Sequence, residues 1–193
     1  MKQLGIIARA PGPHTSRGNK AHEKYPYLLK GLTINRVNQV WATDITWIPT
    51  ESGSLYLVAI LDLYSRFILS WKLDNSLEVD FCIDALKEAL KLGKPEIFNS
   101  DQGSQFTAAA FTGVLKEHRI QISMDGKGRY ADNIFVERFW RSLKYEEVYP
   151  REYESGEEAY HGISSYIDYY NQKRIHQSLD YSTPVEVYNR KVV

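Results

Sequence analysis

Three acidic residues have types and positions that could serve metal-dependent chemistry: Asp44, Asp101 and Glu137. Asp44 lies inside WATDITWI, an apolar and β-branched segment typical of a half-buried strand, where an unpaired charge is costly. Asp101 follows the strand-like segment EIFNS, and open α/β sheets place their sites at the carboxyl ends of strands. Carboxylate oxygens are the ligands that Mg²⁺ prefers. The three residues could therefore hold divalent ions, provided that the fold brings them together.

Helix geometry positions Glu137. With 3.6 residues per turn, one polar stripe of the predicted helix is formed by Asn133, Glu137, Arg141 and Lys144. The opposite side is apolar and carries Phe135, Val136, Phe139 and Leu143. This pattern predicts a helix that packs on a sheet and presents one carboxylate and two cations. Such a stripe is usually only a solvated face, and in a chain with 24 acidic residues a triplet of carboxylates carries little weight alone.

The elements that would position these residues follow a clear order. VWATDITWIPT, LYLVAILDLYS and RFILSWKL predict three strands of an antiparallel meander. Helical spacing then predicts a helix over residues 77–92, with Ser76 as its N-cap and Gly93 as its end. Further along, the pattern predicts strands at 96–100 and 120–123 and helices at 107–118, from near Asp132 towards Tyr149, and at 156–171. The fold class is α/β and ribonuclease-H-like, with a mixed five-stranded sheet of three antiparallel strands, then parallel strands, flanked by helices.

Charge divides the chain into two parts. Residues 1–38 carry seven Lys or Arg against the single Glu23 and include a segment rich in Pro and Gly, so we expect a basic N-terminal arm or linker. Residues 39–193, with 17 basic and 23 acidic residues, form the predicted catalytic core with a C-terminal helical extension. The arm is either a solvated tail or a segment that lies along phosphates, and charge alone does not choose.

Several classes of protein are disfavoured by composition. The lone Cys82 cannot form an internal disulfide, and the five His residues show no metal-ligand spacing, so neither a disulfide scaffold nor a zinc site is expected. The N-terminal apolar stretch is too short for a signal-peptide core or a membrane span, which favours a cytoplasmic protein that needs no membrane. The 14 Tyr lack the Arg and His neighbours of a tyrosine recombinase.

Longer motifs resemble a known family, the DDE transposases and retroviral-type integrases, specifically the integrase catalytic core of bacterial insertion-sequence transposases of the IS-three type. The segments that carry the resemblance are VWATDITWIP, YLVAILDLYSRFILSW, PEIFNSDQGSQFT, ISMDGKGRYADNIFVERFWRSLKYEEVY and YNQKRIHQSLDYSTPVEVY, in family order from about residue 26 to the end. The 35 residues between Asp101 and Glu137 are typical of this superfamily, and Lys144 follows Glu137 by seven, where the family carries a basic residue.

The resemblance implies that Asp44, Asp101 and Glu137 are both the catalytic residues and the metal ligands of a DNA-cleaving and DNA-joining enzyme. The expected cofactor is Mg²⁺, as two ions, with Mn²⁺ as a substitute. Expected partners are transposon ends and target DNA, a second copy of the chain on DNA, and a helix-turn-helix domain encoded upstream, for which this chain has no room. A nucleoid-associated bacterial location follows. Lys127, Arg129, Arg141 and Lys144 are expected to contact phosphates rather than bases.

Two other acidic residues have simpler interpretations. Asp62, three residues before Ser65, is predicted to cap an Asx-turn, and Asp132 is predicted to cap a helix. Two alternative functions stay open at this stage: a truncated, non-catalytic module that binds DNA or assists assembly, and a ribonuclease-H-like nuclease. Strand joining by the purified protein would separate a transposase from both alternatives.

Overall fold

One mixed sheet of five strands organises the chain. The structure, a computed structural model, describes residues 23–125 and 134–190. Strands β1 (Val40–Thr50), β2 (Gly53–Asp62) and β3 (Ile68–Asp74) form an antiparallel meander, and β4 (Ile97–Ser100) and β5 (Gln121–Met124) add in parallel on the other side of β1. The strand order is β3-β2-β1-β4-β5. The predicted sheet, with its antiparallel and parallel parts, is confirmed.

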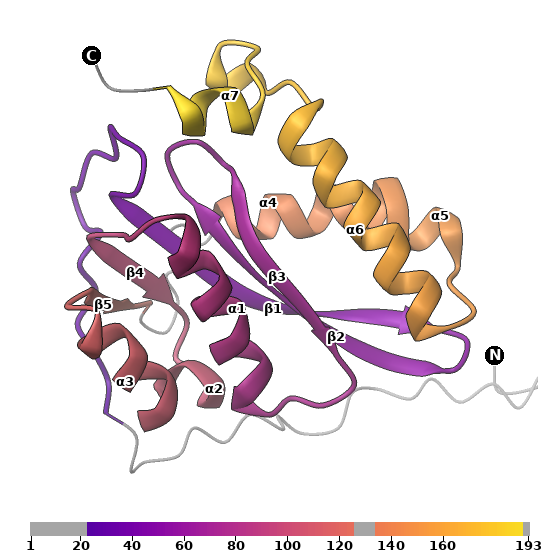
Figure 1. The fold of residues 1–193 in the computed structure, drawn as a ribbon, viewed down its shortest axis with the longest axis horizontal. Coiled ribbons are helices and arrows are strands. Elements are labelled where there is room, and N and C mark those ends of the chain that lie inside the picture. Colours follow the sequence, from indigo (N-terminus) through magenta and orange to yellow (C-terminus); the bar gives the residue numbers. More distant parts are fainter. Residues whose placement is uncertain (1–22, 126–133, 191–193) are drawn as a thin grey trace, which may run out of the picture.

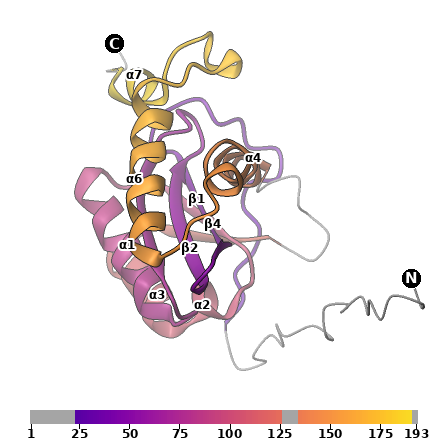
Figure 2. The same cartoon turned by 90° about the vertical axis from the view of Figure 1, so that its right-hand side faces the viewer.

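Helices cover both faces of this sheet (Figures 1 and 2). One face holds α1 (Val79–Leu92), α2 (Ser104–Thr107) and α3 (Ala109–Glu117), and the other holds α4 (Ile134–Leu143) and α6 (Gly156–Gln172). Successive strand residues point to opposite faces, so Val40 and Ala42 pack towards α4 and α6, whereas Trp41 packs towards α1 and α3. A sheet covered on both faces explains why its strands are almost continuously apolar.

Helix boundaries differ from the prediction in three places. The helix α1 begins at Val79 after Glu78, so Ser76 is not its N-cap; the Ser76 backbone N–H instead donates to Asp74 Oδ1 (2.8 Å) in the preceding turn. The helix predicted at 107–118 is α3, which begins at Ala109 because Ala108 takes an extended conformation, and the short helix α2 before it was not predicted. The segment η3 (Gln177–Leu179) and the capped helix α7 (Pro184–Asn189) were not predicted.

The helix that carries Glu137 widens after its last regular turn. A π-helical turn, η2 (Lys144–Val148), follows α4 directly and leads into α5 (Tyr149–Arg151). The predicted start near Asp132 lies outside the described residues, as does the predicted cap at that position. No helix in the described ranges is both long enough and apolar enough to cross a membrane.

Asp62 has a structural role, as predicted. Its side chain is fully buried, and Oδ1 accepts hydrogen bonds from the backbone N–H (2.8 Å) and the hydroxyl (2.6 Å) of Ser65. Its Oδ2 accepts from the Asn38 backbone N–H (2.7 Å), which joins the β2–β3 turn to the start of β1. Both carboxylate oxygens are therefore committed to the backbone, and Asp62 is not part of a reactive site.

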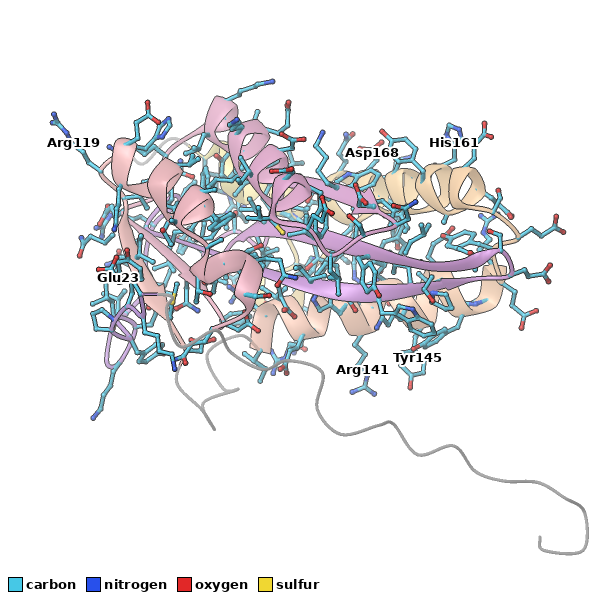
Figure 3. The ribbon with its side chains drawn as sticks, turned by 90° about the horizontal axis from the view of Figure 1, so that it is seen from below. Glu23, Arg119, Arg141, Tyr145, His161 and Asp168 are labelled. Carbon is cyan, nitrogen blue, oxygen red and sulfur yellow. The ribbon has the colours of Figure 1, made fainter. Side chains whose placement is uncertain are left out.

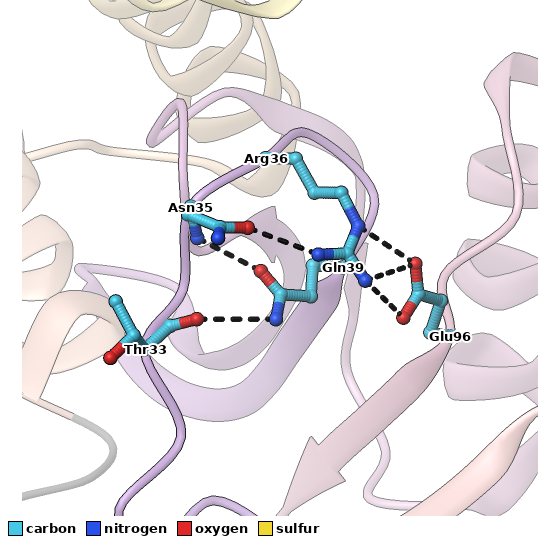
Figure 4. A network of polar contacts seen from close by, with 5 residues as sticks. All are labelled: Thr33, Asn35, Arg36, Gln39 and Glu96. Atoms are coloured by element: carbon cyan, nitrogen blue, oxygen red, sulfur yellow. Dashed lines mark hydrogen bonds and ion pairs between the residues drawn. The ribbon is translucent and has the colours of Figure 1, made fainter.

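The segment before β1 is anchored by a polar network (Figure 4). The Arg36 guanidinium donates to both carboxylate oxygens of Glu96, at 2.7–3.0 Å, next to the start of β4. The Gln39 amide accepts from the Asn35 backbone N–H (2.9 Å) and donates to the Thr33 carbonyl (3.2 Å). These contacts fix where β1 enters the sheet beside β4. The part of the predicted basic arm before residue 23 lies outside the described residues.

Asn171 ties α6 to the meander and offers a test of this packing. Its buried amide accepts from the Ile68 backbone N–H (2.9 Å) and donates to the Ile68 carbonyl (3.0 Å). The change Asn171→Leu leaves both buried backbone groups unpaired, and we expect it to lower the free energy of unfolding by about 2–4 kcal/mol. Urea denaturation measures this loss. Gln172→Leu, at the exposed neighbouring position, is the control and should change stability by less than about 0.5 kcal/mol.

Candidate active site

Strand alternation turns Asp44 towards α4. Asp44 shares the parity of Val40 and Ala42, whose side chains pack on the α4 side of the sheet. There, the indole Nε1–H of Trp140 donates a hydrogen bond to Asp44 Oδ2 (3.0 Å). Trp140 is 6% exposed, so this donor is withdrawn from water and held by packing. Asp44 thus has the partner that a half-buried carboxylate requires.

The register of β1 and β4 determines where Asp101 lies. These strands run parallel, with Ala42 paired to Asn99. Asp44 and Asp101 each follow that pair by two residues, so the register carries both carboxylates to the same level of the sheet. The Gly103 backbone N–H donates to Asp101 Oδ1 (2.8 Å). A Cβ at position 103 would lie 2.9 Å from that oxygen, so the turn favours glycine for close approach.

Glu137 reaches the same region from the helical layer. It lies three residues before Trp140 on α4, so the two are neighbours on the helix surface. Its side chain is exposed, whereas Val136, Phe139 and Leu143 pack against the sheet as predicted. Phe135 is only partly buried and lies under the guanidinium carbon of Arg66, 3.4 Å from its ring centroid. The helix therefore buries one side and offers Glu137 on another.

Electrostatics tie the three carboxylates together. Burial, together with the charges of Asp101 and Glu137, raises the pKa of Asp44 to about 6, against the opposing hydrogen bonds from Ile45 and Trp140. Desolvation also raises the pKa of Asp101, opposed by the Gly103 N–H; since Asp101 is exposed in part, this desolvation is incomplete. The charges of Asp101 and Glu137 are therefore near enough to Asp44 to act on its carboxylate.

The arrangement falls short of a closed metal site. Among residues 23–125 and 134–190, no three His, Cys, Asp or Glu side chains lie close enough together to hold one ion. Repulsion between like charges keeps carboxylates apart until a cation offsets it. The donor set itself, three carboxylates without sulfur or imidazole, suits a hard divalent cation. The ligand assignment of Asp44, Asp101 and Glu137 stays a prediction.

The predicted phosphate-contacting residues divide into two groups. Arg141 and Lys144 lie after Glu137 on the same helical segment, and Figure 3 shows Arg141 projecting away from the fold. Burial lowers the pKa of Lys144, and the charge of Asp44 acts in the opposite direction, which puts this ammonium group within electrostatic range of Asp44. Lys127 and Arg129 lie outside the described residues, so nothing here places them.

Sequence reasoning missed two contributors to this site, Trp140 and Gly103. Trp140 is counted most simply as a core residue of the amphipathic helix, yet its position three residues after Glu137 is a signal that its indole could reach the same site. Gly103, two residues after Asp101, is a residue type common in turns, and from the sequence it indicates only a turn into the next helix. In both cases the missing information is which acceptor the N–H meets.

Comparisons with known proteins agree with this geometry. Two models, both described as an integrase core domain, match residues 34–129 and 118–184. The chain is 37% identical to the transposase for insertion sequence element IS904 of Lactococcus lactis, over 97% of this chain and 81% of that protein. It is 34% identical to the transposase InsF of Escherichia coli for insertion sequence IS3A, over its full length and 69% of the relative. The chain belongs to the insertion-sequence transposases with an integrase core domain.

Solved structures add the fold. The catalytic core domain of HTLV-2 integrase, in a complex with magnesium, superimposes with a TM-score of 0.67 at 19% identity and covers 80% of this chain and 98% of that one. A simian T-cell lymphotropic virus intasome structure gives a TM-score of 0.71 at 17% identity, and the match covers 92% of this chain and 63% of the intasome chain. The predicted ribonuclease-H-like fold and family assignment are confirmed, and the chain is a transposase catalytic core.

The raised pKa of Asp44 predicts a stability that depends on pH. Because ionised Asp44 is disfavoured in the folded protein, stability falls as pH rises from the ordinary Asp pKa of 3.8 through about 6. The change Asp44→Asn removes that charge. In EDTA at pH 8 the variant should be more stable than the parent by about 1–2 kcal/mol, after discounting for solvent, and the two should converge near pH 4. Thermal denaturation across pH measures this, and parallel curves would contradict it.

The Trp140 hydrogen bond predicts a second effect on the same group. The change Trp140→Phe keeps a large aromatic side chain but removes the donor to Asp44 Oδ2. Since that bond favours the ionised carboxylate, its loss should raise the pKa of Asp44 above about 6. Carbon-13 NMR titration of the Asp44 carboxyl group in metal-free protein reports the midpoint. Trp71→Phe, on β3, is the matched control, and an unchanged midpoint in the Trp140 variant would sink the idea.

Proposed function

We propose that this domain cleaves DNA at transposon ends and joins the freed 3′-hydroxyl to target DNA, with Asp44, Asp101 and Glu137 as the ligands of divalent metal ions. One observation carries the proposal: the parallel register of β1 and β4 sets Asp44 and Asp101 at one level of neighbouring strands, beneath the helix that carries Glu137. Three carboxylates come from three separate elements, and the charges of Asp101 and Glu137 help to raise the pKa of the largely buried Asp44, which is costly for the fold unless the group acts on a cation.

Mg²⁺ is the cation that the donor set favours, since the proposed ligands are all carboxylate oxygens, which are hard ligands. Bound there, a pair of such ions would lower the pKa of an attacking water or 3′-hydroxyl and stabilise the departing oxygen. The HTLV-2 integrase core in complex with magnesium has the same fold, which supports this choice of metal. Mn²⁺ is proposed as a substitute.

The other residues near the site have supporting roles. Trp140 orients Asp44 through its indole N–H, and Gly103 orients Asp101 through its backbone N–H. The guanidinium of Arg141 and the ammonium of Lys144 are suited to hold the sugar-phosphate backbone against the carboxylates, because phosphate attraction needs only positive charge in reach. DNA is therefore the proposed substrate, and this domain is proposed to act as part of a homo-oligomer on DNA, with a helix-turn-helix region of the full transposase recognising the ends.

A strand-transfer assay on labelled oligonucleotides with transposon-end sequences tests the proposal. With Mg²⁺ or Mn²⁺ the protein should give products longer than the substrate, and with EDTA it should give none. We expect Asp44→Asn, Asp101→Asn and Glu137→Gln each to reduce joining by at least about a thousandfold while DNA affinity changes little, because ion coordination serves only the chemical step.

Matched controls keep the test specific to these carboxylates. Asp84→Asn on α1 and Glu157→Gln on α6 remove exposed carboxylates elsewhere and should leave joining unchanged. Near-normal joining by any of the three site variants would remove that residue from the set. Hydrolysis of RNA in hybrids without joining would favour a nuclease, and DNA binding without any product would favour a non-catalytic module.

A further inference from the structure

Two exposed tyrosines lie on the helical segment that follows Glu137. Tyr145 is 68% exposed and Tyr149 is 47% exposed, although large aromatic side chains usually pack into a core. Their rings meet edge to face, with centroids 5.5 Å apart and an interplanar angle of 83°. The guanidinium carbon of Arg141 lies 5.9 Å from the Tyr145 centroid, within cation–π range. We call Tyr145 and Tyr149 the tyrosine pair.

The π-helical turn explains why both rings point outward. Its backbone bond runs from the Tyr149 N–H to the Lys144 carbonyl, five residues back, and residues four apart on such a turn lie on the same side of the helical segment. The residues between the tyrosines are anchored inward: Val148 is buried, Glu146 accepts from Tyr166 Oη (2.8 Å) and from Arg174, and Glu147 accepts from Tyr153 Oη (3.1 Å). The tyrosine pair is therefore held on a rigid turn rather than on a loose loop.

The surroundings of the pair identify the chemistry of its ligand. Lys144, directly before Tyr145, lies within electrostatic range of Asp44, so the pair borders the candidate active site. Figure 3 shows Arg141 and Tyr145 projecting on the same side of the molecule. The nearby carboxylates of Glu146 and Glu147 are already paired with Arg174 and Arg151, and within residues 23–125 and 134–190 no ion pair engages Arg141 or Lys144, which leaves both cations for an anionic ligand. Exposed aromatic faces beside unpaired cations are the means by which proteins bind unstacked nucleobases.

We infer that the tyrosine pair is a stacking site for an unpaired nucleobase at the DNA end, next to the phosphates held by Arg141 and Lys144. The inference rests on the proposed function for its choice of DNA as ligand. A base released from the duplex offers a flat face to Tyr145, and Tyr149 contacts the edge of the Tyr145 ring and limits its rotation. Because every base has such a face, the site recognises an unpaired end rather than a sequence.

Binding of DNA ends in EDTA and low salt tests this inference without any need for cleavage. The probes are a blunt duplex and the same duplex with a three-nucleotide overhang that carries 2-aminopurine, whose fluorescence reports stacking. The parent protein should bind the overhang probe more tightly and quench its fluorescence. The double variant Tyr145→Ala with Tyr149→Ala should weaken binding to the overhang probe about tenfold and leave blunt-end binding within about twofold.

Conservative and remote variants complete the design. Tyr145→Phe with Tyr149→Phe keeps both rings and should retain the preference for the overhang. Tyr169→Ala removes a tyrosine that is 45% exposed on α6, whose His161 and Asp168 project on the opposite side from Arg141 in Figure 3, and should change neither probe. Equal losses on both probes, or a loss of self-association in place of a loss of quenching, would overturn the inference.

Failure of the proposed function would look different. A protein that prefers the overhang but never joins strands retains the stacking site and loses the assignment of the carboxylates. A protein that joins strands but binds both probes equally, with no quenching, retains the carboxylates and loses the stacking site. The two outcomes come from separate measurements on the same preparation.

Discussion

The pairing of β1 with β4 is the constraint on which the site depends. These strands are neighbours because the helix α1 forms a crossover from β3, at the end of the meander, to β4, which pairs in parallel with β1. A slip of one residue in this pairing would turn the carboxylate of one strand to the opposite face. The network of Arg36, Gln39 and Glu96 at the entry to both strands, with the Asp62 bond to Asn38, fixes this register at the end of the sheet remote from the carboxylates. The carboxylates of Glu96 and Asp62, which have structural roles, thus help to fix the positions of Asp44 and Asp101.

The site combines opposing forces that the rest of the fold must offset. Burial and like charges raise the pKa of Asp44, whereas the Trp140 and Ile45 donors lower it. Burial and the neighbouring negative charges favour binding of a cation by Asp44. The hydrogen bonds from Trp140 and Ile45 hold the carboxylate in one orientation when no cation is bound. Two hydrophobic clusters, one on each face of the sheet, supply the packing that offsets the cost of burying Asp44. Function and stability pull in opposite directions here, as they commonly do at active sites.

Much of this could be predicted from the sequence because the signals are local. Alternating and helical apolar periods predicted every strand and the main helices, and Ser65 three residues after Asp62 predicted a capped turn rather than a catalytic role. The missing details depend on which of several possible partners or conformations a residue adopts. Ser76 is a residue type suited to an N-cap, yet its backbone N–H donates to Asp74 Oδ1 in the preceding turn. Ala108 takes an extended conformation, so α3 begins one residue later, at Ala109. The short helix α7 is capped by Thr183 and Glu186, which stand three residues apart. Trp140 could be assigned to the core from its period but not to Asp44, because an indole N–H can meet its acceptor on any neighbouring element.

One helical segment supplies most of what the strands lack. From Glu137 to Tyr149 it presents the carboxylate of Glu137, the indole that donates to Asp44, the cations of Arg141 and Lys144 and two exposed rings, and its buried side is continuous with the core. Tyr145 and Tyr149 are four residues apart and their rings are in contact, while Glu146 and Glu147 between them pair with Arg174 and Arg151. Movement of this segment would therefore displace Glu137, the Asp44 donor and the tyrosine pair together. The sheet provides fixed positions for Asp44 and Asp101, and the helix determines where Glu137, Arg141 and Lys144 lie relative to them.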